Sequence, residues 1–437
     1  MMLVNFLVAG STDFSKAAMV VCAIAFAVAA FIDINIGLVA ILLSMLLSPE
    51  LEAGAVGSRA IVIRAEDVLL IIVSLTWLAK MAVKKTPLIR QSPLNVPIGL
   101  YIAVLCLSTA RGMFLGNVAP LKGAFYVFKL IEYFVLYFIV LNETTNIKQV
   151  KIFLGVLFFV GVIVGIYGNT HIGDIGRISA PFEGEGEPNT LGGYVLFLLS
   201  LLGGLIYYYK KRRRILLLVF LFLVPTFLFT LSRASYMGAI PALIVFVVLA
   251  KDKRVLNTVL MFALIGILIF AFGPPVLKSR VLGTFQPEEQ QALKEVGGIR
   301  LGPSPAARVE SWTIALKDKL PKRPALGYGV TGAGFLDSQY ILVLVETGII
   351  GFLVFMWLMW RVWRSALYAY NTVKSPLFKG IAMGFLVGFV GILFHAVGSN
   401  SFVIIRIAEP FWFFAAIVVK LVDIETGKAA MEDLRMR

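Results

Sequence analysis

Hydrophobic residues in this chain fall into long runs that short polar breaks separate. Runs such as Ile215 to Leu223 do not alternate in the way that a membrane β-barrel requires. A helix formed by such a run crosses ~30 Å of hydrocarbon and satisfies its own backbone hydrogen bonds there. The pattern therefore predicts an all-α polytopic membrane protein, a bundle of roughly 12 or 13 transmembrane helices.

The first two apolar runs leave the number of crossings open. Asp33 and Asn35 separate them, so they form either a tight hairpin or one long helix. The predicted spans are residues 17–32, 34–48, 67–83, 94–110, 119–141, 150–169, 189–209, 214–231, 235–250, 255–272, 337–363, 378–398 and 402–422. The chain accordingly divides into N-terminal helices (1–272), a loop region (273–336), C-terminal helices (337–422) and a tail (423–437).

Basic residues gather in every second connection between these runs. They are Lys84, Lys85, Arg90, Lys148, Lys151, Lys210, Lys211, Arg212, Arg213, Arg214, Lys251, Lys253, Arg254, Arg361, Arg364, Lys374 and Lys379. The positive-inside rule places these connections, and the tail, in the cytoplasm. The outward connections are then about 49–66, 111–118, 170–188, 232–234, 273–336 and 399–401.

Composition supports the bilayer as a partner. Only 15% of residues are charged, against about 25% in soluble domains. The net charge of +15 would suggest nucleic acid in a soluble protein, but here basic loops and anionic lipid account for it. We expect no nucleic-acid partner. Two histidines and two cysteines, both within apolar runs, are too few for a metal cluster, so no metal or cofactor is expected.

The outward loop at 273–336 is long and rich in Gly and Pro, which favours a functional role. Two of its stretches, Gln286 to Val296 and Arg308 to Leu320, could be helical. Residues 327–332 satisfy the G-x-G-x-x-G fingerprint, but no strand precedes them, so we interpret them as a flexible hinge. In the run at 378–398, Gly380, Gly384 and Gly388 predict close helix packing.

Several arginines lie outside the basic connections. They are Arg111, Arg177, Arg233, Arg280, Arg300 and Arg308. Arg233 occupies a very short break between two apolar runs, where Pro225 and Pro241 could kink both helices. It is either a snorkelling anchor to lipid phosphate or a phosphate clamp, since its planar donor fork matches two phosphate oxygens.

Arg177 begins a polar outward stretch that ends at a helix start. Glu183, Glu185 and Glu187 alternate with glycine there, and Asn189 is a candidate N-cap. The stretch is either a solvated acidic turn or a strip that binds sugar hydroxyls and supplies a general base. Arg308 and Trp312 share a helix face. They could hold an anion and a sugar ring, or mark a helix lying on the membrane.

Three stretches together resemble the O-antigen ligase and O-antigen polymerase family of GT-C-type bacterial membrane glycosyltransferases. The first is Pro188-Asn189-Thr190-Leu191-Gly192, and the second is Thr230-Leu231-Ser232-Arg233-Ala234. The third runs from Arg308 and Trp312 through Pro324, Gly327 and Gly329 to Asp337-Ser338-Gln339-Tyr340 and Glu346-Thr347-Gly348-Ile349-Ile350-Gly351. The resemblance covers roughly residues 150–420.

The resemblance implies a multi-pass protein of the inner (cytoplasmic) membrane whose site faces the periplasm. Its donor would be a glycan on undecaprenyl pyrophosphate, transferred without a metal, with a chain-length regulator or flippase as possible partners. Arg233 and Arg308 match the expected pyrophosphate binders. The candidate binding residues are completed by Arg177, Arg280, Asn189, Trp312 and Tyr340.

The candidate catalytic residues are Asp337 and Glu187. Ligases of the family usually carry a His where this chain has Leu336-Asp337-Ser338. The missing His favours a polymerase, with Asp337 as a substitute base or, equally, as a helix N-cap. A ligase that transfers the finished glycan to a lipid A core or another acceptor is the alternative. A lipid-glycan flippase or permease fits less well, because the halves show no repeat.

Overall fold

The structure is a computed structural model of the chain. It describes residues 24–48, 50–56, 59–85, 89–172, 176–182, 187–252, 294–296, 299–301, 303–334 and 336–427. The predicted span at 255–272 and the candidate residue Arg280 lie outside these ranges.

Helices dominate the described residues, and two short antiparallel hairpins accompany them. The helices are α3 (Ile34–Leu47), α4 (Ala65–Lys84), α5 (Asn95–Phe114), α6 (Pro120–Glu143), α7 (Ile147–Thr170), α8 (Pro188–Tyr208), α9 (Arg213–Phe229), α10 (Arg233–Ala250), α13 (Pro303–Ile314), α14 (Gln339–Thr372), α15 (Pro376–His395) and α16 (Ile405–Glu425). The hairpins are β1 (Glu50–Val56) with β2 (Arg59–Arg64), and β3 (Lys294–Val296) with β4 (Ile299–Leu301).

The predicted helical membrane bundle is confirmed. Among the described residues, seven helices are long and apolar enough to cross a membrane: α5, α6, α7, α8, α10, α14 and α15. Helices α3 and α9, with 14 and 17 residues, are shorter than these seven, and α4 and α16 carry charged residues. Asp33 separates helical residues 24–32 from α3 and caps α3 by accepting from Asn35 N, so the first two runs form two helices rather than one.

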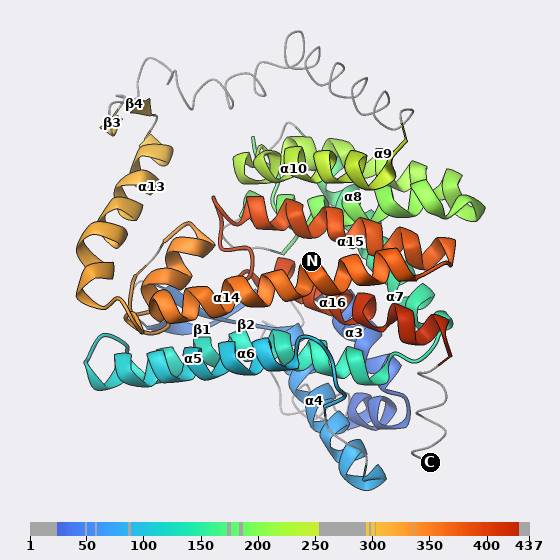
Figure 1. Ribbon diagram of the computed structural model, residues 1–437, viewed down its shortest axis with the longest axis horizontal. Coiled ribbons are helices and arrows are strands. Elements are labelled where there is room, and N and C mark those ends of the chain that lie inside the picture. The colour runs from blue at the N-terminus through green and yellow to red at the C-terminus, as the bar shows by residue number, and fades with distance from the viewer. Residues whose placement is uncertain are drawn as a thin grey trace, which may run out of the picture.

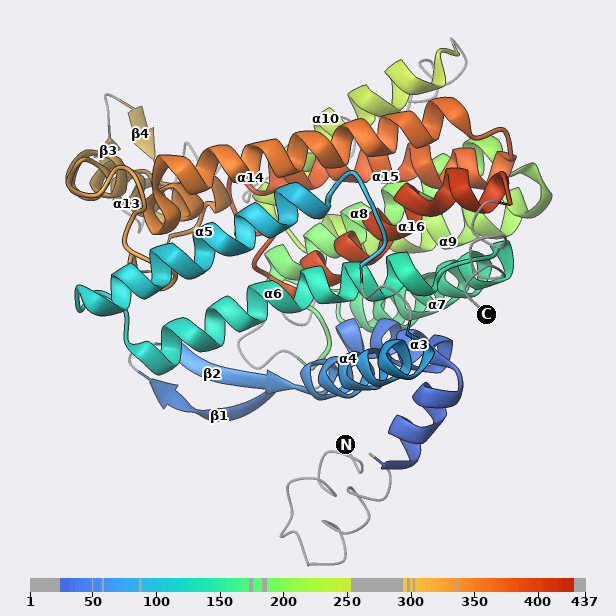
Figure 2. The ribbon, with the colours of Figure 1, turned by 60° about the horizontal axis from the view of Figure 1, so that its bottom comes forward.

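The connections sort to the two ends of the bundle as the alternation of basic loops predicts. Figures 1 and 2 show α5, α6, α14 and α15 running side by side, with α13 and β3–β4 at one end and the end of α16 at the other. We call these the outer end and the basic end. At the basic end, the Tyr208 hydroxyl at the end of α8 bonds the Tyr370 hydroxyl of α14, which in turn donates to Leu249 O of α10.

Glycines set the closest helix contact, between α8 and α15. A Cβ on Gly384 would lie 2.6 Å from Leu201 Cα, and one on Gly388 would lie 2.8 Å from a ring carbon of Phe197. Only a residue without a side chain lets the two backbones approach so closely. The predicted packing role of the glycine series in α15 is thereby confirmed.

Helix α14 is broken at Gly348, whose φ of 71° and ψ of −173° are not helical. The segment 324–329 fills the break. Ile349 N donates to Pro324 O at 2.7 Å, and Gly329 N donates to Glu346 O at 2.8 Å. The backbone groups freed by the break are therefore satisfied by protein, as an interrupted membrane helix requires. The interpretation of residues 327–332 as a flexible hinge was wrong, because this segment is hydrogen-bonded to α14.

One of the two helices predicted in the long loop is present among the described residues. Its second helical stretch is present as α13, which continues through a π-helical turn at Ala315–Lys319. The first stretch was expected to be helical up to Val296, but residues 294–296 form β3 and pair with β4. The remainder of that stretch lies outside the described residues.

Candidate functional site at the outer end

The start of α8 is hydrogen-bonded to the turn between α9 and α10. The Ser232 hydroxyl donates to Asn189 Oδ1 at 2.8 Å, and the Ser235 hydroxyl donates to Ser232 Oγ at 2.8 Å. Gly192 allows this approach, because a Cβ there would collide with Ser235. Two of the three stretches that suggested the family therefore meet in space, through residues that are buried or half-buried.

Asn189 does not cap α8 as expected. The helix begins at Pro188, so Glu187 is the N-cap residue and Asn189 lies inside the first turn. Proline suits the first helical position because its missing N–H needs no partner there. The exposed Glu187 carboxylate accepts from the Thr190 hydroxyl at 3.3 Å, and the Asn189 amide is used to hold the α9–α10 turn instead.

Arg233 occupies the first position of α10, directly after the N-cap Ser232. Its side chain is half-buried. Leu231, with φ of 49°, makes the sharp turn out of α9, and Pro225 and Pro241 lie inside the two helices as expected. A guanidinium at a helix N-terminus adds its charge to the positive end of the helix dipole, an arrangement suited to an anion.

The loop that carries Arg177 packs beside this turn. Ile178 N donates to Phe229 O, the last residue of α9, at 3.1 Å. Arg177 is half-buried, one residue before this contact. The structure therefore brings the Arg177 loop, the Asn189 helix start and the Arg233 turn to one place.

Arg308 and Asp337 form an ion pair across the long loop. Arg308 Nε donates to Asp337 Oδ2 at 3.1 Å, and the side chains keep 26% and 33% of their exposure. The expected N-cap role of Asp337 is wrong, since Ser338 precedes the first residue of α14. A partly exposed carboxylate of this kind can be reached by a substrate hydroxyl and can accept its proton.

The two aromatic candidates have different surroundings. Trp312 lies one turn after Arg308 on α13, half-buried, and its Nε1 atom has no hydrogen-bond partner among the described residues. Tyr340 donates its hydroxyl to Leu393 O of α15 at 2.7 Å. This bond fixes the start of α14 on α15, so Tyr340 has at least a structural part in the site.

His395 lies between the start of α8 and the start of α14, and the sequence did not single it out. The ring is fully buried, with Nε2 3.2 Å from Asn189 O and Nδ1 2.7 Å from the Ser401 hydroxyl. A carbonyl only accepts, so Nε2 carries the proton and Nδ1 accepts from Ser401. The next residue, Ala396, accepts from Gln339 N at 3.0 Å. Residues 395–396 thus join the α8 start to the α14 start.

A buried charged cluster lies beneath this end and was also missed. Its carboxylates are Glu66, Asp67, Glu132 and Glu409, and its cations include Lys129 and Arg406. Lys129 pairs with Asp67, and Arg406 donates to Ser48 O and Pro181 O. Both Glu409 carboxylate oxygens lack a hydrogen-bond partner among the described residues. Apart from Glu66, these residues lie inside the predicted apolar runs, and only that position could have drawn attention to them.

The described residues bring together no group of three or more His, Cys, Asp or Glu side chains that could hold a metal ion. The polar side chains gathered at this end are arginines, the partly exposed carboxylate of Asp337, the exposed carboxylate of Glu187 and buried hydroxyls. Such a set can hold an anion and take up a proton.

Comparison with known proteins finds a family model that matches part of the same region. A family model described as O-antigen ligase matches residues 218–356. This stretch contains Arg233, Arg308, Asp337 and the broken start of α14. No curated protein matches the chain. The match supports the O-antigen ligase and polymerase family that the sequence motifs suggested.

Proposed function

We propose that this chain, a multi-pass membrane protein of the O-antigen ligase and polymerase family, polymerises glycan repeat units carried on undecaprenyl pyrophosphate. The single observation that carries the proposal is the partly exposed ion pair between Arg308 and Asp337, at the bundle end where Arg233 begins α10. A cation and a base at one end are what glycosyl transfer from a pyrophosphate needs.

In the proposed reaction, an acceptor hydroxyl attacks the anomeric carbon of the donor glycan. The bond between that carbon and the pyrophosphate oxygen breaks, and the pyrophosphate leaves on its polyprenyl carrier with added negative charge. Arg233 and Arg308 stabilise that charge. Asp337 accepts the hydroxyl proton, with Glu187 as the second candidate base.

The Arg308 guanidinium has room for this role. Asp337 engages its Nε atom, and its terminal nitrogens have no hydrogen-bond partner among the described residues. The donor fork can therefore bind phosphate oxygens while Nε holds Asp337. Trp312 lies on the same helix and could stack on a sugar ring, and Arg177 and Asn189 would line the opposite side. Arg280 keeps its proposed binding role on sequence grounds alone.

A ligase of the same family is the second candidate function, because the family match is described as O-antigen ligase. A gel of surface and lipid-linked glycans from cells with and without the gene separates the two. A polymerase deletion leaves single repeat units on their carrier or acceptor. A ligase deletion leaves full-length polymer on the carrier. If the chain were a flippase or permease, its deletion would leave the repeat unit on the cytoplasmic side.

The proposed clamp is tested by Arg233→Lys, which keeps the charge but loses the planar fork. We expect transfer to fall by about tenfold or more, because a bidentate charge-assisted contact becomes a single one. Arg213→Lys, in the exposed turn at the basic end, is the matched control. Glycan lengths of wild-type distribution in the Arg233→Lys strain would refute the clamp.

A further inference from the structure

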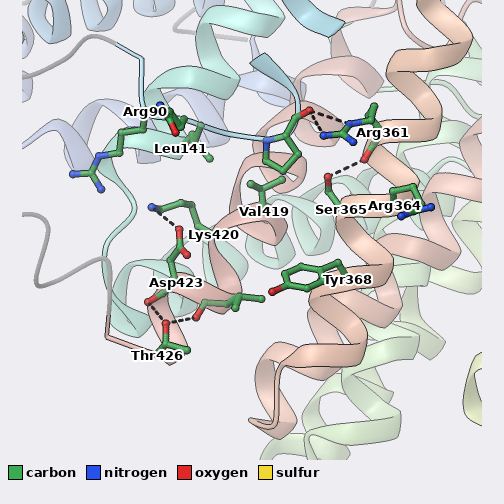
Figure 3. Close-up of a pocket in the computed structure, with 13 residues that line it drawn as sticks. Arg90, Leu141, Arg361, Arg364, Ser365, Tyr368, Val419, Lys420, Asp423 and Thr426 are labelled. Carbon is green, nitrogen blue, oxygen red and sulfur yellow. Dashed lines mark hydrogen bonds and ion pairs between the residues drawn. The ribbon is translucent and has the colours of Figure 1, made fainter. Parts of the chain in front are cut away.

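A cavity of about 440 Å³ lies at the basic end, away from the proposed transfer site. It opens between α14, α16 and the segment before α5 (Figure 3). Four of its lining side chains are cationic, namely Arg90, Arg361, Arg364 and Lys420, and Asp423 is its one carboxylate. Arg90, Arg361 and Arg364 belong to the basic connections of the predicted topology, and Lys420 lies in the last predicted span.

Two of these cations have no carboxylate partner in the described part of the chain. Arg361 donates through Nε and Nη2 to Pro93 O at 3.2 and 3.1 Å, which holds the guanidinium without neutralising it. Arg364 lies over the Trp360 ring at 5.2 Å. Lys420, by contrast, is paired with Asp423 at 3.1 Å. The positive charge left over in the cavity is therefore that of the two arginines.

The Tyr368 hydroxyl completes the donor set. Figure 3 shows it directed toward the wall formed by Asp423 and Thr426. Ser365 also lines the cavity, but its hydroxyl donates to Arg361 O at 2.8 Å. Arg90 extends away from the other side chains in Figure 3, so its charge lies outside this donor set. Guanidinium and hydroxyl donors around one open space match the oxygens of a phosphate group.

The cavity also lies at the level where phospholipid headgroups meet the protein. Trp357 and Trp360 are 36% and 49% exposed on α14, one turn before the arginines, and exposed Trp marks the membrane–water interface. Beyond the arginines, Tyr368 is 63% exposed. Basic pockets between transmembrane helices at the cytoplasmic side bind anionic headgroups.

We propose that Arg361, Arg364 and Tyr368 form a binding site for a phosphate-bearing anion, supplied either by an anionic phospholipid or by free phosphate. A headgroup held there would bridge α14 and α16 at the end remote from the transfer site. The inference is independent of the proposed function, and its test reads binding rather than transfer.

The test is a titration of the purified full-length protein in neutral detergent, read as the shift in melting temperature. Phosphatidylglycerol is the lipid probe, phosphatidylcholine the zwitterionic control, and inorganic phosphate the soluble probe at matched ionic strength. Arg364→Gln is the main variant because it removes no hydrogen bond seen among the described residues. Arg213→Gln removes an equal charge from the exposed turn at the same end.

We expect phosphatidylglycerol to stabilise the wild type saturably, and Arg364→Gln to weaken its apparent affinity about tenfold, as loss of one charge-assisted contact predicts. Arg213→Gln should leave it unchanged. The same pattern with inorganic phosphate alone identifies a free anion as the ligand. Tyr368→Phe, at an exposed position, tests the site should Arg364→Gln fail to fold, and it too should bind more weakly.

Two results overturn the site. In one, neither probe stabilises the protein more than phosphatidylcholine or salt does. In the other, Arg213→Gln weakens binding as much as Arg364→Gln, which makes the effect one of diffuse surface charge.

Discussion

The two ends of the bundle use their arginines differently. At the outer end, arginines bond to oxygens of the protein itself: Arg308 to Asp337, Arg111 to Gly327 O, and the buried Arg406 to Ser48 O and Pro181 O. At the basic end, the turn at Lys210–Arg212 is exposed, and Arg361 and Arg364 line an open cavity, although Arg361 also donates to Pro93 O. The basic residues behind the net charge of +15 therefore have two roles: some bond to the protein's own oxygens, and others are exposed or line a cavity.

Hydrogen bonds join the helices at both ends, but those at the outer end lie at the candidate site. Backbone and side-chain bonds at the outer end connect α8, the α9–α10 turn, α14 and α15 through Asn189, Ser232 and His395. Such a joined set holds donors in fixed positions, as stabilising a developing charge requires. Substitutions at the outer end should thus affect transfer, whereas those at the basic end should affect the response to lipid.

Among the substitutions that test this difference between the two ends, Asp337→Asn should have the largest effect. Removal of a general base costs about 10²–10⁴-fold in rate, so transfer by the purified protein from a lipid-linked repeat unit should fall into that range. Stability should change by less than about 1 kcal/mol, because the ion pair with Arg308 is partly exposed.

Asp318→Asn, on an exposed turn of the same loop region, is the control for the lost charge. Glu187→Gln tests the second candidate base. If Glu187→Gln slows transfer more than Asp337→Asn does, the base has been assigned to the wrong carboxylate.

Much of this arrangement could be predicted from the sequence, because lipid forces a simple pattern. Apolar runs of helical length and alternating basic connections located nearly every described helix to within a few residues. The number of crossings was less well defined. Of the predicted 12 or 13, seven described helices have both the length and the apolar character of a span, and one predicted run lies outside the described residues.

Contacts between distant residues could not be predicted. His395 gains its role from Asn189 and Ser401, and the buried pairing of Lys129 with Asp67 depends on how α4 and α6 pack. The N-cap assignments failed for a local reason. Asn189 and Asp337 are both good N-cap residues, but α8 begins one residue before Asn189 and α14 begins two residues after Asp337.

The break in α14, which the segment 324–329 fills, gives the second prediction. Gly348 has φ of 71°, and a Cβ there would collide with the Ala325 carbonyl. Gly348→Ala should therefore reduce the free energy of unfolding by about 1–3 kcal/mol, measured by thermal denaturation in detergent. Gly99→Ala, in α5 with open space around its Cα, should raise it by up to about 1 kcal/mol. Equal stabilities for the two variants would mean that the break in α14 is not maintained by Gly348.

The smallest effect is expected for Ser232→Ala. Its comparison with Ser375→Ala tests one helix start at each end of the bundle. Ser232 caps α10 by accepting from Ser235 N and also donates to Asn189, whereas Ser375 precedes α15 at the basic end without a side-chain cap bond. Ser232→Ala should cost about 1 kcal/mol, and Ser375→Ala close to nothing. Ser232→Ala should also slow transfer, because Arg233 follows it directly and Asn189 loses its partner. A stability loss with full transfer activity would show that the Asn189–Ser232 bond holds the fold but does not position the clamp.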